Sequence, residues 1–233
     1  MVDINIMAIF SIIVMIGALI YAYYKKIKMT YALIFTNFFI FILTVIFPDV
    51  IYDLGFRPIY LSLDYLPNLY TLFTSMFIHG GFAHIIGNMI VFFFVGSAFE
   101  SRIGGKNFLI VYFISGIIGT LTHSIVNLGS STILIGASGA IFGIMGAFAY
   151  LYPYDEIVMP IPLGIIMLIR RVKVIYAVAM FALFETVIVL IGVSDSTAHF
   201  AHLGGLIGGL LIAVLYVKNK AVMWNRYPSF VIR

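Results

Sequence analysis

Residues 107–154 read NFLIVYFISGIIGTLTHSIVNLGSSTILIGASGAIFGIMGAFAYLYPY, a run of 48 residues without Lys, Arg, Asp or Glu. A helix crosses a bilayer with about 20 apolar residues, so this run is too long for a single span. Residues 127–136 contain Gly129, Ser130, Ser131 and Gly136, which favour a loop. The run therefore predicts one span at residues 107–126 and a second helix at residues 138–152.

The composition of the whole chain agrees with a membrane protein. Of its 233 residues, 63% are hydrophobic and only 9% are charged, whereas soluble domains carry about 25% charged residues. The chain has no cysteine, which excludes disulfides, thiol catalysis and thiolate metal sites. Its pI near 9.2 does not indicate nucleic-acid binding, because the basic residues form short clusters between apolar runs, as in membrane proteins.

Charges and prolines divide the rest of the chain into five further apolar stretches. Asp3 stands where a signal peptide would be basic, so the first stretch is interpreted as a retained helix. Residues 49–82 contain several charges and prolines and are expected to form an ordered interfacial loop. The prolines at 153–162 predict an irregular connection with a short interfacial piece at 163–169. The predicted fold is all-α, a polytopic transmembrane helix bundle whose other spans are residues 4–24, 30–47, 82–101, 174–192 and 198–217.

The basic residues predict how the bundle is oriented. With the N-terminus outside, 12 of the 13 Lys and Arg residues fall on one side of the membrane, and only Arg57 falls on the other. The positive-inside rule makes the first side cytoplasmic. We therefore expect an integral multi-pass protein, in a prokaryotic plasma membrane, with its N-terminus outside and its C-terminus in the cytoplasm.

Four polar residues on three of these helices are predicted to lie in one layer of the membrane. At about 1.5 Å per residue, Ser138, His202 and Asn88 lie about 20–22 Å from the cytoplasmic ends of their helices, and His84 lies about 25 Å from its own. A helix that begins at Ser138 is too short to cross a hydrocarbon layer of about 30 Å. The preceding loop must therefore enter the membrane, which is tolerated around a water-filled cavity.

The residue types in this layer suit nucleophilic catalysis. Ser138 begins its helix, where free N–H groups and positive potential favour a developing oxyanion. His84 and Asn88 lie four residues apart on one helix face and can both donate hydrogen bonds. No carboxylate is expected to orient His202, so the pattern predicts a serine–histidine dyad rather than a triad. The two helices can pack closely because small residues follow both Ser138 (Gly139 and Gly143) and His202 (Gly205 and Gly209).

The remaining polar residues are interpreted as structural. Glu185, in the middle of a span, is expected to be a protonated or hydrogen-bonded packing residue. His199, one turn before His202, is expected to face the mouth of the cavity. Other expected roles are structural contacts at the cytoplasmic end (Glu100 and Arg102), a tether for the first loop (His79) and an interfacial position (His123).

On these residues the sequence resembles the rhomboid proteases, over roughly residues 30–217. The serine motif of that family, Gly-x-Ser-Gly, matches Gly136-Ala137-Ser138-Gly139. Its histidine motif, Ala-His-x-x-Gly-x-x-x-Gly, matches Ala201-His202-Leu203-Gly204-Gly205 and continues to Gly209, whereas His199 lacks this spacing. Two further elements, His-x-x-x-Asn and Gly-x-x-x-Glu-x-x-x-Gly, match His84 to Asn88 and Gly96, Glu100 and Gly104.

The resemblance implies an intramembrane serine endopeptidase with a six-helix core at residues 30–217. Residues 1–29 would add an N-terminal helix, and residues 218–233 a short basic cytoplasmic tail. Ser138 and His202 would be the catalytic dyad, with an oxyanion hole from His84, Asn88 and backbone N–H groups. The resemblance implies membrane proteins with a single span as substrates, cut within or next to that span, and neither a metal nor a cofactor. Two positions depart from the family: Tyr70-Thr71 replaces a Trp-Arg pair, and Phe142 stands where a tyrosine often packs under the histidine.

Two other functions are alternatives to the protease. An inactive relative that binds or escorts membrane proteins would usually lack the serine or the histidine, and this chain keeps both. A small transporter or channel would use the polar layer as a solute site, but its broken helices should recur in matching halves of the chain. The sequence has no such inverted symmetry.

Overall fold

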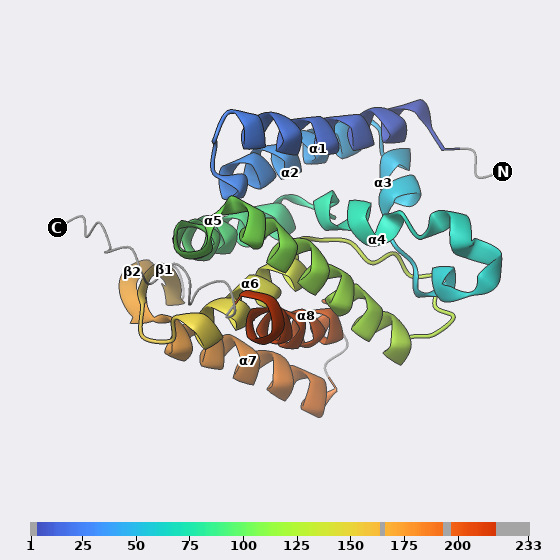
Figure 1. The fold of residues 1–233 in the computed structure, drawn as a ribbon. Coiled ribbons are helices and arrows are strands. Elements are labelled where there is room, and N and C mark those ends of the chain that lie inside the picture. The colour runs from blue at the N-terminus through green and yellow to red at the C-terminus, as the bar shows by residue number, and fades with distance from the viewer. Residues whose placement is uncertain (1–3, 164–165, 193–196, 218–233) are drawn as a thin grey trace.

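The computed structural model describes residues 4–163, 166–192 and 197–217, and these are mostly helical. Figure 1 shows a bundle in which α1 and α2 pair along one edge and α7 lies at the opposite edge. Among the described residues, four helices are long and apolar enough to cross a membrane, and two shorter apolar helices accompany them. The predicted helical bundle is confirmed, and the chain is an integral membrane protein.

The first two helices form a hairpin. The helix α1 (Ile6–Tyr24) begins after Asn5, whose side-chain oxygen accepts a hydrogen bond of 2.8 Å from the Met7 N–H. The helix α2 (Met29–Ile46) follows after a short basic turn. Its first turn is capped by Glu100, whose carboxylate accepts hydrogen bonds from the N–H groups of Met29 and Thr30 and from the Thr30 hydroxyl. The predicted spans 4–24 and 30–47 are confirmed to within two residues.

The first loop is ordered, as predicted, and consists of short helical turns. Two hydrogen bonds hold its two ends together: the hydroxyls of Tyr70 and Thr74 donate to the carbonyl oxygens of Asp53 and Leu54, each over 2.8 Å. The turns are α3 (Asp49–Leu54), η1 (Pro58–Leu61), η2 (Leu63–Asn68), α4 (Thr71–Thr74) and η3 (Ser75–Phe77).

Gly104 divides the longest helix, α5 (Phe82–Val126), into two spans. Its φ of 77° and ψ of 156° are not helical and suit glycine, so the chain turns there and residues 82–103 and 105–126 run as separate helices. This matches the predicted spans 82–101 and 107–126. At the turn, Arg102 forms an ion pair of 2.7 Å with Asp155, and the structural roles predicted for Glu100 and Arg102 are confirmed.

Three helices complete the bundle. They are α6 (Ser138–Leu151), α7 (Val174–Ile191) and α8 (His199–Ile212), which continues as a π-helical turn, η4 (Ala213–Val217). The 14 residues of α6 extend over only about 21 Å, so the prediction of a helix too short to span is confirmed. In Figure 1, α6 and α8 lie in the middle of the bundle, between α7 and the second half of α5.

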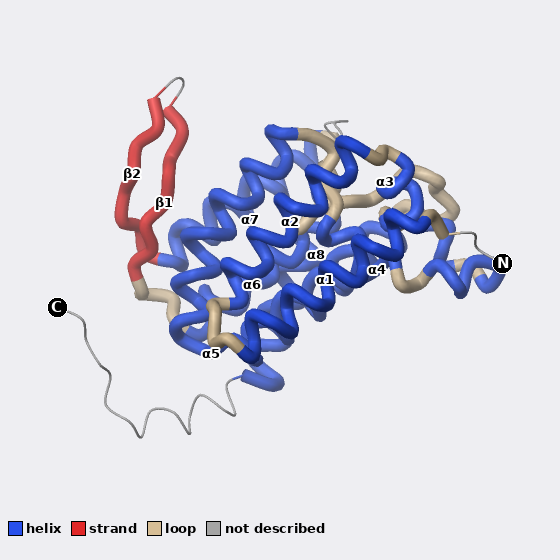
Figure 2. The backbone as a smooth tube through the Cα atoms, turned by 90° about the horizontal axis from the view of Figure 1, so that it is seen from above, coloured by secondary structure: helices blue, strands red, loops and turns tan. Residues whose placement is uncertain are grey.

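The connection from α6 to α7 differs from the prediction. Instead of an irregular segment, the strands β1 (Glu156–Leu163) and β2 (Ile166–Lys173) form an antiparallel hairpin in which Glu156 pairs with Lys173. Figure 2 shows this hairpin extending away from the helices. Prolines at 160 and 162 are tolerated because a two-stranded sheet consists only of edge strands. The division into segments 1–29, 30–217 and 218–233 stays a prediction, and the last segment lies outside the described residues.

Candidate active site

Ser138 is the first residue of α6, and the loop before it determines where that helix begins. Gly136 has a φ of 121°, a conformation that favours glycine, and its N–H donates a hydrogen bond of 3.0 Å to the Ser75 carbonyl oxygen. The first loop also holds this segment, because the backbones of Phe56 and Leu134 exchange two hydrogen bonds of 3.1 and 2.7 Å. The position of Ser138 therefore depends on backbone hydrogen bonds between the first loop and the segment before α6.

Glycines allow α6 and α8 to touch along their backbones. A Cβ atom at Gly209 would lie 1.8 Å from the carbonyl oxygen of Gly143, and one at Gly146 would lie 2.2 Å from that of Leu206. Neither side chain could be accommodated without moving a helix. The predicted close packing through small residues is therefore found in the structure.

This packing brings the predicted nucleophile and base into contact. The Nε2 atom of His202 lies 2.8 Å from the Oγ atom of Ser138, which is hydrogen-bonding distance. The imidazole is 7% exposed and stacks on the Phe142 ring, with centroids 4.5 Å apart and planes inclined by 4°. A serine hydroxyl bonded to a fixed imidazole is the arrangement that an activated nucleophile requires.

The structure places His84 beside this pair. The Gly80 N–H donates a long hydrogen bond of 3.4 Å to His84 Nδ1, so a neutral His84 ring carries its hydrogen on Nε2. That Nε2 faces Gly136, where a Cβ atom would lie 2.7 Å from it and 3.7 Å from Ser138 Oγ. Glycine at 136 thus leaves room between a donor and the serine.

Asn88 lies one turn further along α5, and its Nδ2 atom is buried without a hydrogen-bond partner among the described residues. Buried amide groups are usually satisfied, so an unused donor at this place requires an explanation. A substrate oxygen would supply the missing acceptor. The role of Asn88 as an oxyanion donor stays a prediction.

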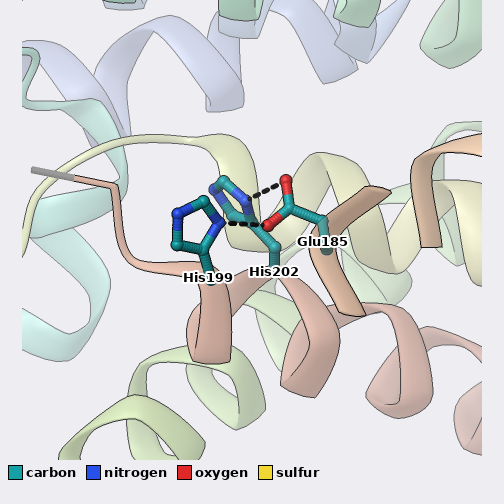
Figure 3. A group of neighbouring side chains, drawn as sticks. All are labelled: Glu185, His199 and His202. Carbon is teal, nitrogen blue, oxygen red and sulfur yellow. Dashed lines mark hydrogen bonds and ion pairs between the residues drawn. The ribbon is translucent and has the colours of Figure 1, made fainter. Parts of the chain in front are cut away.

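A carboxylate lies on the far side of His202, and this corrects the prediction that none would be there. Figure 3 shows the carboxylate of Glu185 of α7 directed at both His199 and His202 of α8, with one oxygen toward each ring. Its Oε1 lies 2.9 Å from His202 Nδ1, and its Oε2 lies 2.6 Å from His199 Nδ1. The first contact is an ion pair by distance, although the ring N–H is not aligned as in a regular hydrogen bond. His199 is 9% exposed and bonded inward, so the prediction that it faces the cavity mouth is also wrong.

The same three side chains are of types that bind divalent cations, and their ligand atoms lie within 4.8 Å of one another. Contacts of 2.6 and 2.9 Å are those of one carboxylate between two imidazoles. We therefore interpret Glu185, His199 and His202 as mutual partners and not as metal ligands.

His79, in the turn before α5, is 1% exposed and its ring meets that of His84 edge to face, with centroids 4.9 Å apart. Burial, and next the neighbouring His84, lower the pKa of His79 to about 3. The backbone of Phe77 opposes this lowering. His79 packs on His84 of α5, and its role as a tether of the first loop stays a prediction.

Comparison with known proteins identifies the family. The model of the Rhomboid domain matches residues 67–219, which is more than half of the chain. The putative rhomboid protease YdcA of Bacillus subtilis (strain 168) is 31% identical over 150 residues, which cover 64% of this chain and 68% of YdcA. RHOMBOID-like protein 1 of Arabidopsis thaliana is 29% identical over 154 residues, 64% of this chain but only 35% of that protein.

Rhomboid protease GluP of Bacillus subtilis (strain 168) is also similar, at 29% identity over 153 residues, which cover 64% of this chain and 26% of GluP. The alignments cover about a third of RHOMBOID-like protein 1 and about a quarter of GluP. Because the Rhomboid model matches most of the length of this chain, the chain belongs to the rhomboid family.

Proposed function

We propose that this protein is an intramembrane serine endopeptidase, which hydrolyses peptide bonds within or next to the transmembrane segments of other membrane proteins. The observation that carries the proposal is the distance of 2.8 Å between Ser138 Oγ and His202 Nε2. Relatives such as YdcA and GluP are named rhomboid proteases, which supports the same activity. An active hydrolase needs its nucleophile and base in contact, and an escort protein does not.

In the proposed reaction, His202 Nε2 accepts the proton of the Ser138 hydroxyl while Oγ attacks the carbonyl carbon of the scissile bond. The carbonyl oxygen becomes an oxyanion. Imidazolium His202 then gives the proton to the leaving amine, and the C–N bond breaks to leave an ester on Ser138. A water molecule, deprotonated by His202, hydrolyses this ester and restores the hydroxyl.

Three sets of donors are proposed for the oxyanion. His84 presents its Nε2–H, Asn88 presents its unused amide, and the first backbone N–H groups of α6 have no partner within the helix. The helix N-terminus adds positive potential at the same place. Donors that are held in place and aimed at a developing charge usually supply the largest part of the rate enhancement.

The proposed substrates are proteins with a single transmembrane helix that unwinds easily and has a small residue before the cut, as the resemblance implies. The scissile carbonyl must leave its own helix to reach Ser138, because a helical carbonyl is already hydrogen-bonded. The lipid bilayer is the common solvent of enzyme and substrate. We also propose the orientation with the N-terminus outside and the C-terminus cytoplasmic, in a prokaryotic plasma membrane, on the distribution of Lys and Arg.

The test uses the full chain in proteoliposomes with a tagged single-span substrate and a fluorophosphonate probe for active serines. We expect cleavage and probe labelling in the wild type, and neither in Ser138→Ala or His202→Ala. Ser131→Ala, an exposed serine in the loop before α6, is the matched control and should retain both. Labelling that persists in Ser138→Ala would overturn the assignment of the nucleophile. Absence of labelling in a folded wild type would favour the inactive relative, and solute flux that survives Ser138→Ala would favour the transporter.

A further inference from the structure

Glu185 and His199 form a buried polar contact that the proposed serine–histidine reaction does not use. Glu185 is 5% exposed in α7, a helix otherwise made of apolar residues and Thr186, and His199 is 9% exposed at the start of α8. A carboxylate in the membrane interior is costly unless it is paired. Such a residue calls for a function, and its two oxygens each meet an imidazole nitrogen (Figure 3).

The contact with Glu185 determines which nitrogen of His202 carries the hydrogen. An ionised carboxylate can only accept, so the Nδ1 atom that lies 2.9 Å from Glu185 Oε1 has to bear the hydrogen. The neutral ring then keeps its lone pair on Nε2, the atom that lies 2.8 Å from Ser138 Oγ. This is the tautomer that can accept the serine proton, and the opposite tautomer cannot.

His199 explains how Glu185 can be ionised in this environment. Its Nδ1 atom approaches Glu185 Oε2 to 2.6 Å, a short contact typical of a charge-assisted hydrogen bond. A protonated His199 and an ionised Glu185 form a neutral pair, which lowers the cost of burying the carboxylate. The pair also fixes the rotation of the carboxylate, because one oxygen is held by His199 while the other is directed at His202.

We propose that Glu185 is a positioning residue that holds His202 in the tautomer and orientation of a general base, and that His199 keeps Glu185 ionised and in place. The inference rests on the proposed function, since it assigns a role in the same reaction. It replaces the predicted dyad by a chain of four groups, from Ser138 through His202 and Glu185 to His199. The imidazolium formed during the attack would lie against the carboxylate, which stabilises it.

Glu185→Gln tests this role with little change of shape. The neutral amide cannot accept from both imidazoles as the carboxylate does, so we expect kcat to fall by about a hundredfold, the low end of what a general base contributes. KM should change by less than about twofold, because no contact to substrate is lost. Glu185→Asp keeps the charge and should recover part of the rate. Thr186 is exposed on α7, and its hydroxyl donates a hydrogen bond to the Ala182 carbonyl oxygen of the same helix. Thr186→Ala is therefore the matched control and should have the activity of the wild type.

The pH profile separates positioning from mere packing. Without the negative charge at 185, the His202 imidazole releases its proton more readily, so the acid limb of the kcat/KM profile should move to lower pH in Glu185→Gln. The other titratable side chains near His202 are His199 on its own helix and His84 and His123 on α5, and none of them is substituted in this variant. His199 loses its carboxylate partner, but its ring centroid lies 6.2 Å from that of His202 whereas the carboxylate contacts His202 at 2.9 Å, so the loss of the carboxylate sets the direction of the shift. A packing defect would lower the amount of folded enzyme but would not shift the acid limb of the kcat/KM profile.

The outcomes decide between the two proposals. If the wild type neither cleaves nor labels at Ser138, the proposed function fails, whatever the variants do. If the wild type is active and Glu185→Gln has the same kcat and the same acid limb, the positioning role is overturned while the protease stands. If Glu185→Gln does not fold, His199→Gln decides instead: a fall in kcat of about tenfold with the limb moved to lower pH supports the role, and an unchanged kcat overturns it.

Discussion

Gly205 of α8 lies against the backbone of Gly139 of α6, so closely that a Cβ atom at Gly205 would be 2.0 Å from the Gly139 carbonyl oxygen. The two glycines lie next to the residues of the proposed dyad, one residue after Ser138 and three after His202. The contact between the hydroxyl and the imidazole therefore depends on this backbone approach. A side chain at Gly205 would push the two helices apart, whereas a Cβ atom at Gly139 would meet the nearest atom, the Ala201 carbonyl oxygen, at an ordinary contact distance of 3.4 Å.

Gly205→Val should impair both folding and chemistry. The added carbons overlap the neighbouring backbone, which cannot yield as a flexible side chain does, so we expect the variant to be destabilised by about 1–3 kcal/mol and its serine to react more slowly with a fluorophosphonate. Melting temperature in detergent and the rate of labelling measure the two effects. Gly17→Val is the matched control, because a Cβ atom at Gly17 would lie more than 4 Å from the other atoms of the described residues that could obstruct it. A Gly205→Val protein with wild-type labelling would show that the helices do not need this contact.

Asn88→Ala should slow the chemical step without weakening the fold. The Nδ2 atom has no hydrogen-bond partner among the described residues, so its removal leaves no acceptor unsatisfied in the free enzyme. If it is a full oxyanion donor, kcat falls by about a hundredfold while the melting temperature changes little. Asn107→Ala is the control, since that amide donates a hydrogen bond to the Ile103 carbonyl oxygen beside the turn that divides α5 at Gly104, away from the serine. An unchanged kcat in Asn88→Ala would remove it from the oxyanion hole.

The helices and the serine–histidine contact could be predicted from the sequence because both follow from spacing along the chain. Span boundaries come from the length of apolar runs, and the break between the two halves of α5 from its charges and glycines. The spacing of Gly143 and Gly209 indicated which faces could touch, and the structure has their backbones in contact. The depth of each residue in the membrane and the glycine face of each helix are together enough to predict that Ser138 contacts His202.

The pairing of Glu185 could not be predicted in the same way. Position along a span gives the depth of a side chain but not the rotation of its helix relative to the others, and α7 carries no small-residue face that would fix it. His199 lies one turn before His202, and the sequence does not show whether its ring faces the proposed cavity or the neighbouring helix α7. The hairpin of β1 and β2 was missed because its apolar residues do not alternate with polar ones, and without alternation a strand cannot be distinguished from an irregular segment.

Glu100→Gln should destabilise the protein and leave the chemistry intact. The carboxylate accepts three hydrogen bonds of 2.7–2.8 Å at the start of α2, and a buried amide in its place would turn an NH₂ group toward these donors. We expect a loss of about 1–3 kcal/mol, read as a lower melting temperature, with kcat per labelled serine unchanged. Glu156→Gln, an exposed glutamate at the start of β1, is the control and should melt like the wild type. A loss of kcat in folded Glu100→Gln would contradict a purely structural role.

His79 should make the protein less stable in acid. Its pKa is about 3 in the folded protein and near 6.5 when the chain is unfolded, so only the unfolded state takes up the proton between these values. Its contribution to stability is therefore complete well above pH 6.5 and declines as the pH falls towards 3, with a loss of about 2 kcal/mol at pH 5 relative to the value at high pH. His79→Leu removes the titrating group and replaces a buried ring by an apolar side chain. Melting temperatures in detergent at pH 7.5, 6 and 5 should fall less steeply in this variant, and parallel curves for variant and wild type would show that another group governs the acid response.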